Sequence, residues 1–148
     1  MSETSASTDP LMLVRSVNAT AAFNRWCGIE VLSAGDGQAE IAMPWRAEAG
    51  QYAGFLHAGL IGALIDTACG FAAVTLVGRV LASHYAVNCL RPAVGERFIA
   101  RARVVKPGKT QVFTYCELFA LMNGLEKLVA TGETLLTPVS QERASDEH

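Results

Sequence analysis

The sequence predicts an α+β domain in which an antiparallel sheet packs on one long central helix, with a short helix at the N-terminus. Residues 60–81 form an almost continuously apolar stretch, which suits a helix surrounded by the rest of a fold. Four strand-like runs separated by turn residues follow this stretch, and two shorter alternating runs precede it. Composition agrees, because 148 residues that are 51% hydrophobic can bury one sizeable core.

The first third of the chain is expected to form a short helix and a pair of strands. Between residues 11 and 26, after an Asp-Pro pair that suits a helix start, apolar residues recur at intervals of three and four. Gly28 closes this helix. Residues 29–32 and 39–43 alternate as strands across a Gly-Asp-Gly turn, and residues 45–56, with two glycines and little periodicity, are interpreted as a loop.

The central helix is expected from His57 or Ala58 to Leu76 or Val77, with Gly78 as its stop. Turn chemistry, including a Pro-Gly and an Asn-Gly pair, separates the strands that follow. Each of these strands is expected to pair with the next in a meander; the four are residues 83–91, 97–106, 110–121 and 125–136.

Charge and termini exclude several classes of protein. A net charge of −2 offers no reason to expect nucleic acid or an anionic membrane as a partner. A membrane span through residues 60–81 would bury Asp66 at a cost of about 2.5–3.5 kcal/mol and lacks flanking cations. The domain is expected to occupy residues 11–138, with disordered polar tails at 1–10 and 139–148.

The four cysteines are widely spaced, and no two of them form a Cys-x-x-Cys pair. They are interpreted as reduced, buried residues, which favours a cytoplasmic location. No metal site is expected.

His57 and Asp66 place two chemical groups on the central helix. Nine helical residues advance about 13.5 Å and turn through about 900°, so the two side chains lie at different heights on opposite faces. One substrate bond cannot contact both ends of this arrangement. If both are used, the helix start of one subunit must meet Asp66 of another, which requires a homodimer with sites at the subunit interface.

Each end of that arrangement has a functional and a structural interpretation. The helix start has no Ser, Thr, Asp or Asn as a cap, so the N–H groups of Ala58 and Gly59 are free to hold an oxyanion unless His57, Gln51 or water caps them. Small residues surround Asp66, including Gly70 one turn later. They indicate either a cleft beside a catalytic carboxylate, or a close helix contact in which Asp66 is hydrogen-bonded to a neighbour such as Thr67.

The same segment resembles the hotdog-fold acyl-CoA thioesterases of the phenylacetate-pathway type, called PaaI-like. That family has the pattern Asn-x-x-Gly-x-x-His-Gly-Gly followed by Leu-x-Asp. This chain has Gln51-x-x-Gly54-x-x-His57-Ala58-Gly59 and then Leu64-Ile65-Asp66. The run Val-Asn-Cys-Leu-Arg-Pro-Ala at residues 87–93 resembles the strand and turn that follow the helix in the family. The resemblance covers roughly residues 15–137, and the family pattern differs here at Gln51 and Ala58.

The resemblance implies a hotdog fold, hydrolysis of an acyl-CoA thioester, and a homodimer or homotetramer; coenzyme A is part of the substrate and no separate cofactor is needed. Asp66 would be the catalytic base or nucleophile, the Ala58 N–H would polarise the thioester carbonyl, and Gln51 would orient water or substrate. His57 would shape the helix start. Residues expected to contact the substrate are Gly59, Thr67, Gly70, Ser83 and His84.

Six of the 12 cationic residues lie between positions 91 and 109. Arg91 and Lys109 are candidates to bind the phosphates of coenzyme A, whereas Arg97, Arg101 and Arg103 are interpreted as a solvated strand face. Two rival functions stay open: a catalytically silent acyl-CoA-binding protein, and a hotdog hydratase or dehydratase. The latter would normally use a histidine, and the His-Phe-Pro-Gly run of acyl-carrier-protein dehydratases is absent.

Overall fold

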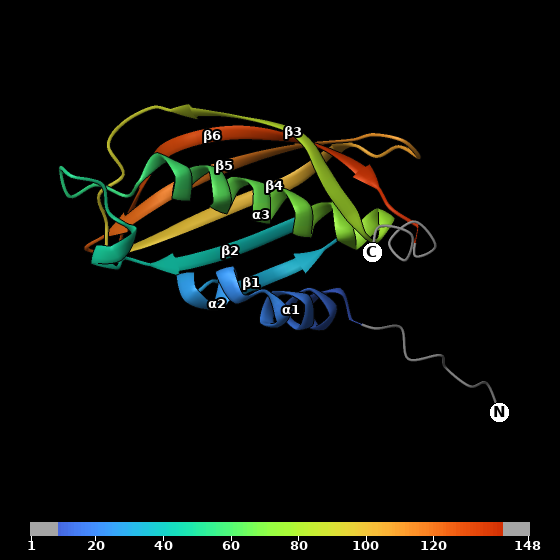
Figure 1. The fold of residues 1–148 in the computed structure, drawn as a ribbon, viewed down its shortest axis with the longest axis horizontal. Helices are drawn as coiled ribbons and strands as arrows, with labels where there is room; N and C mark the ends of the chain where they lie inside the picture. The colour runs from blue at the N-terminus through green and yellow to red at the C-terminus, as the bar shows by residue number, and fades with distance from the viewer. Residues whose placement is uncertain (1–8, 141–148) are drawn as a thin grey trace.

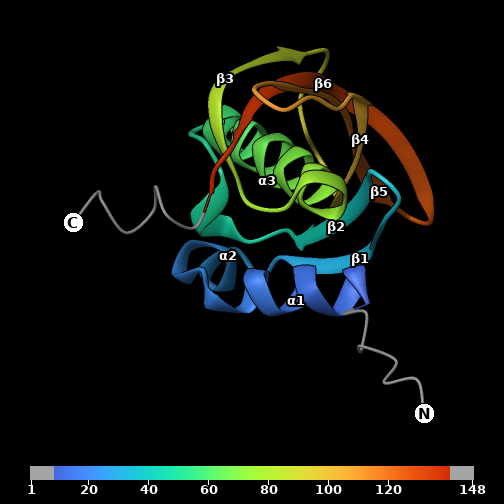
Figure 2. The ribbon, with the colours of Figure 1, turned by 90° about the vertical axis from the view of Figure 1, so that its right-hand side faces the viewer.

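The computed structural model describes residues 9–140, and its centre is helix α3, Ala58–Val77. This helix lies along the concave face of a six-stranded antiparallel sheet that curls around it (Figure 1, Figure 2). Gly78, at φ 77°, ends the helix with its N–H bonded to the Val74 carbonyl at 3.2 Å. The predicted helix and its glycine stop are therefore confirmed.

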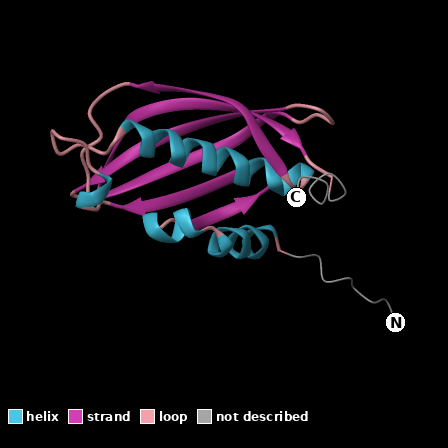
Figure 3. Ribbon diagram, in the orientation of Figure 1, coloured by secondary structure: helices cyan, strands magenta, loops and turns pink. Residues whose placement is uncertain are grey.

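Six strands form the sheet, in the spatial order β1-β2-β4-β5-β6-β3. Figure 3 shows the strands in magenta and the helices in cyan. The strand predicted at 97–106 is reproduced residue for residue, and the other bounds shift by at most three residues. The strands are β1 Glu30–Gly35, β2 Gln38–Pro44, β3 Val80–Cys89, β4 Arg97–Lys106, β5 Val112–Met122 and β6 Leu125–Pro138. A 3-10 turn, Ala47–Ala49, lies in the loop before α3.

The expected meander of four strands after the helix is wrong at its first step. β3 pairs with β6 at the edge of the sheet, and β4 pairs with β2 on its other side. Residues 90–96 carry the chain across, and their backbone bonds reach β6, β5 and the strand end at β2 in turn: Leu90 N to Val129 O, Glu96 N to Leu121 O, and Trp45 N to Glu96 O. This segment is therefore a crossover rather than a hairpin. Its turn residues indicate where the chain bends, but they do not determine which strand becomes the partner.

The N-terminal helix is also divided. The single helix expected between residues 11 and 26 is two, α1 Pro10–Thr20 and α2 Ala22–Cys27, with Ala21 extended between them. At this point a side chain bonds to the backbone, because the Thr20 hydroxyl donates to the Val17 carbonyl oxygen at 2.7 Å. Such bonds compete with the helical pattern. Asp9 caps α1 and Pro10 opens it, so the helix begins inside the expected tail; the rest of both tails lies outside the described residues.

The core is the contact between α3 and the sheet. Among residues 9–140, α3 is the only helix long and apolar enough to cross a membrane, and nine of its residues are buried in the fold, which makes it the core helix. The tightest approach is at Gly132 on β6, where a Cβ atom would lie 2.7 Å from Ile65 Cγ2 and 2.8 Å from Ala86 O. Ile65 is fully buried and directly precedes Asp66, so this contact sets how α3 sits on the sheet.

Candidate active site

His57 caps the start of α3. Its backbone is extended, and its ring Nδ1 accepts a hydrogen bond from the Gly59 N–H at 2.8 Å. The cap depends on glycine at position 59, because an added Cβ would stand 2.9 Å from that ring nitrogen. Of the capping alternatives left open by the sequence, the His57 side chain is the one observed.

The N–H of Ala58 has no hydrogen-bond partner within residues 9–140, and the residue is exposed. It therefore adds an unpaired donor to the positive end of a 20-residue helix. Ala58 is not among the residues with positive φ, so replacing the family's glycine there introduces no backbone strain.

Gln51 belongs to the tight loop that leads into this helix start. Its N–H bonds the Phe55 carbonyl at 2.8 Å, and its side-chain Oε1 accepts from the Phe55 N–H at 3.4 Å and from the Ala53 N–H. The amide nitrogen of the side chain donates to no residue between positions 9 and 140. A cavity of about 480 Å³ adjoins the helix start and is lined by Gln51, His57, Ala58 and Arg91, with apolar residues on α3 and after β3.

Asp66 lies half-buried in a second cavity, of about 340 Å³, lined by residues of the N-terminal helices, α3, β3 and β6. Its carboxylate makes no hydrogen bond or ion pair with any described residue, Thr67 included. Desolvation by burial raises the pKa of Asp66 above its usual value. Thr67 and Gly70 line the same cavity, and a Cβ added at Gly70 would meet nothing within 4 Å.

The two cavities share no lining residue. The structure therefore separates the helix start from Asp66 within one chain, as their spacing on α3 predicted.

The remaining predicted residues lie in three further places. The Ser83 hydroxyl donates to the backbone carbonyl of Leu135 on the neighbouring strand β6 at 3.1 Å, and His84 lines a groove of about 510 Å³ with Arg103 and Glu133. Lys109 lines another cavity, together with Val77 at the end of α3. Arg91 lines the cavity at the start of α3, so the two residues do not share a cavity. Neither Ser83 nor His84 lines the Asp66 cavity of its own chain.

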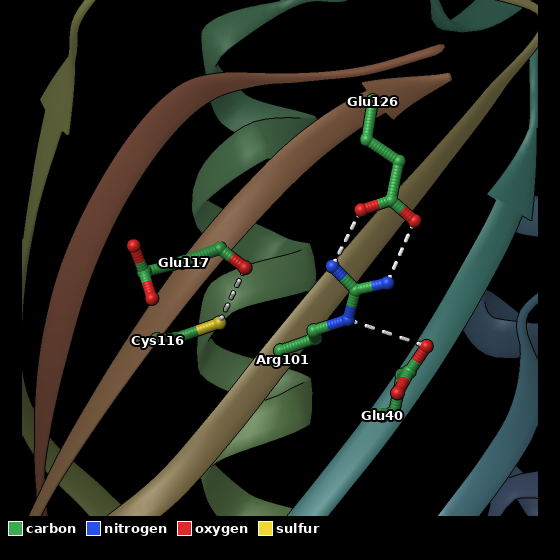
Figure 4. A network of polar contacts seen from close by, with 5 residues as sticks. All are labelled: Glu40, Arg101, Cys116, Glu117 and Glu126. Carbon is green, nitrogen blue, oxygen red and sulfur yellow. Dashed lines mark hydrogen bonds and ion pairs between the residues drawn. The ribbon is translucent and has the colours of Figure 1, made fainter. Parts of the chain in front are cut away.

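The cationic strand face is occupied by ion pairs. On the side of the sheet away from α3, Arg101 makes two bonds of 2.7 Å to Glu126 and one contact of 3.4 Å to Glu40 (Figure 4). Arg97 pairs with Glu30 at 3.0 Å, and the Arg103 guanidinium lies 5.3 Å from the centre of the Tyr115 ring. Pairing with Arg101 lowers the pKa of Glu126. These arginines serve the surface of the sheet, as the alternating pattern indicated.

One polar residue in the Asp66 cavity was missed by the sequence reasoning. Asn24, on α2, is 8% exposed and lines that cavity beside Asp66, where the other residues from the N-terminal helices are Val17 and Ala21. The sequence contained a sign of this position, because Asn24 follows Val17 and Ala21 at helical spacing, three residues after Ala21. A polar residue on an otherwise apolar helix face could have been singled out on that ground.

Known proteins share sequence features and the fold of this chain. The profile of the Thioesterase superfamily matches residues 53–126, half of the chain, from the loop before α3 into β6. A solved thioesterase family protein from Silicibacter pomeroyi is 37% identical, with a TM-score of 0.81 over 84% of this chain and 93% of that one. The PaaI protein from the phenylacetic acid degradation operon of E. coli is 23% identical, with a TM-score of 0.74 over 88% and 96% of the two chains, a likeness of fold.

A curated protein of Halobacterium salinarum, whose name presents it as a candidate esterase, is 35% identical over 91 residues. The match spans 56% of this chain and 60% of that protein, which is less than two thirds of the relative's length.

Proposed function

The chain belongs to the Thioesterase superfamily and has its hotdog fold, and from that membership we propose that it hydrolyses an acyl-CoA thioester to the free acid and coenzyme A. One observation carries the proposal: a half-buried carboxylate without a partner among the described residues faces an apolar cavity, on a helix whose start presents a free N–H. A carboxylate in that state is costly unless a ligand or water meets it.

The start of α3 is suited to hold the thioester carbonyl. The Ala58 N–H would donate to the carbonyl oxygen as negative charge develops there, with the Gly59 N–H already engaged by His57. Removing one such donor costs about 3–4 kcal/mol in enzymes that stabilise an oxyanion this way. The free amide nitrogen of Gln51, in the same cavity, would orient the substrate or water.

Asp66 would supply the base or the nucleophile. Burial raises the pKa of Asp66 in the direction of neutral pH, which makes the carboxylate a better acceptor of a proton from water. Thr67 and Gly70, in the same cavity, would contact the acyl group.

The start of α3 and Asp66 can act on one substrate only if two copies of the chain associate. β3 is one of the two edge strands, with β1 at the opposite edge of the sheet. Nearly all residues of β3 are exposed, and one of its two sides has no strand beside it among residues 9–140. An unpaired edge of this length is a template for a second copy. Antiparallel pairing of β3 with β3 of a partner would bring the helix start of one protomer toward Asp66 of the other. A homotetramer would follow from pairing two such dimers.

The remaining predicted roles are part of the same proposal. Arg91, in the helix-start cavity, and Lys109 would contact the coenzyme A phosphates, while Ser83 and His84 could reach the substrate only across a subunit interface. All four cysteines are free thiols, which suits a reducing cytoplasm. Cys27, Cys69 and Cys116 are buried as expected, whereas Cys89, on β3, is exposed, so the expectation of four buried cysteines is wrong at that position.

The test is thiol release from a panel of acyl-CoA thioesters that vary in chain length and aromaticity. Wild-type turnover, lost in Asp66→Asn with the fold and oligomeric state preserved, supports the hydrolase. Tight binding without thiol release would support the silent acyl-CoA-binding alternative. Hydration or dehydration of an acyl-CoA without thiol release would support the hydratase alternative. Full activity in Asp66→Asn would remove Asp66 from the mechanism.

A further inference from the structure

Asn24 has a fixed side-chain orientation. Its Nδ2 donates to Asn18 Oδ1 at 2.9 Å, and Asn18 Nδ2 donates to the backbone carbonyl of Ile29 at 2.9 Å. A backbone carbonyl only accepts, so the amide of Asn18 must turn its nitrogen toward Ile29 and its oxygen toward Asn24. Asn24 must then present its own nitrogen to Asn18, and the assignment of both amides follows from the network.

The consequence is a free acceptor beside Asp66. Within residues 9–140 the Oδ1 atom of Asn24 accepts no hydrogen bond, although the residue is 8% exposed. This oxygen is not fully enclosed either, since Thr134 Oγ1 is the only unpartnered side-chain atom sealed inside the described part of the protein. The space that Asn24 borders is the Asp66 cavity.

Asn24 and Asp66 line one cavity, and each has an acceptor without a partner among the described residues, the Asn24 amide oxygen and the Asp66 carboxylate. Two acceptors cannot bond to each other, so the species that satisfies both must donate twice, and water is the smallest molecule that does so. The remaining lining residues, among them Val17, Phe71 and Val74, are apolar except for Thr67, whose hydroxyl is a third polar group in the cavity.

We propose that Asn24 is a further catalytic residue, which accepts one hydrogen of the attacking water while Asp66 accepts the other. The inference rests on the proposed thioester hydrolysis. The two bonds would leave a lone pair of the water oxygen to attack the carbonyl carbon. One water proton passes to Asp66, the carbon–sulfur bond breaks, and Asp66 returns the proton to the leaving thiolate. Thioester and water thus become acid and thiol, with Asp66 regenerated as a general base.

The experiment compares Asn24→Ala, Asn24→Asp and the control Arg15→Ala with the wild type. Arg15 donates to Val31 O at 3.1 Å and anchors α1 at a point outside the cavity, so its loss reports on weakened helix docking alone. Each variant is assayed for kcat, KM and the pH dependence of kcat/KM on several acyl-CoAs, with and without hydroxyl groups on the acyl chain. Its Tm is measured in parallel.

Asn24→Ala is expected to lower kcat roughly 10-fold to 100-fold, with KM within about twofold and to the same extent for every acyl group. Asn24→Asp keeps the shape of the residue and adds a carboxylate beside Asp66. Like charge disfavours ionisation, so the acid limb of its kcat/KM profile is expected to move to higher pH. Arg15→Ala is expected to lower the Tm and leave kcat unchanged.

Three results would overturn the assignment. An unmoved acid limb in Asn24→Asp would place Asn24 too far from Asp66. A loss confined to hydroxylated acyl groups would make Asn24 a determinant of acyl specificity. A loss in Arg15→Ala equal to that in Asn24→Ala would make the role structural. If Asn24→Ala does not fold, the acid limb of Asn24→Asp decides. Turnover in wild type and its loss in Asp66→Asn test the proposed function separately.

Discussion

The contact between Gly132 and α3 allows one substitution to be followed from atomic distances to stability. Gly132→Ala would place a methyl group 2.7 Å from Ile65 Cγ2 and 2.8 Å from the Ala86 carbonyl oxygen. Carbon atoms in contact normally lie about 3.5–4.0 Å apart, so the overlap with Ile65 is about 1 Å. Neither neighbour gives way easily, because Ile65 is fully buried and the Ala86 oxygen is backbone.

Overpacking of this kind costs about 1–3 kcal/mol, and the reduced freedom of the unfolded chain returns about 0.5–1 kcal/mol of it. An overlap of about 1 Å places the cost in the upper part of that range, so the expected net loss is about 1–2.5 kcal/mol, or a fall in Tm of roughly 2–10 °C. Because α3 must shift where it carries Asp66, kcat is also expected to fall by more than KM changes.

Gly70→Ala is the matched control, since the same methyl group added there meets nothing within 4 Å. In a helix interior this change is expected to raise stability by about 0.5–1 kcal/mol. Thermal unfolding followed by circular dichroism, with urea titration for the free energy, measures both variants. A Gly132→Ala protein as stable as wild type, or a Gly70→Ala protein equally destabilised, would refute the packing account.

Three further predictions concern the helix and the edge strand. Asp66→Asn is expected to raise the Tm at pH 7, because burial raises the folded-state pKa of Asp66 and its ionised form is disfavoured. The Tm difference should shrink as the pH falls through the raised folded-state pKa and vanish below about 4, where the carboxyl is protonated in both states; a difference that does not change with pH would contradict this. His57→Ala and Gly59→Ala are each expected to lower the free energy of unfolding by about 1 kcal/mol, because both disrupt the same helix cap, the hydrogen bond from the Gly59 N–H to the His57 ring. The double variant should therefore lose less than the sum of the two, and additive losses would show two independent effects. Lysines at Ala86 and Asn88, both exposed on β3, should separate the proposed dimer in sedimentation experiments and reduce turnover in proportion, whereas an intact dimer would place the interface elsewhere.

Local signals account for what could be predicted of the fold. The bounds of α3 follow from a continuous apolar run between a loop and Gly78, and β4 follows from turns on both sides. Partner choice does not follow from such signals. Whether β3 pairs with β4 or β6 depends on contacts far apart in sequence, and a short segment with Pro92 and Gly95 is compatible with either a hairpin or a crossover.

The candidate site shows the same division. The separation of the helix start from Asp66 is a property of helix geometry and could be worked out in advance. Capping by His57 depends on a ring folding back over Gly59, and the place of Asn24 depends on how α2 docks beside α3. Such contacts are set by tertiary packing, which no local periodicity encodes.

The position of β3 at the far edge also has a consequence during synthesis. The ribosome makes β3 directly after α3, but its partner β6 comes last, once β4 and β5 have been made. Until β6 emerges, β3 has no neighbour, and its exposed Leu81 and Tyr85 stand on an unpaired strand. Long-range pairing of this kind is slow and open to aggregation. In the proposed dimer, pairing through β3 would therefore have to wait until the last strand has been made.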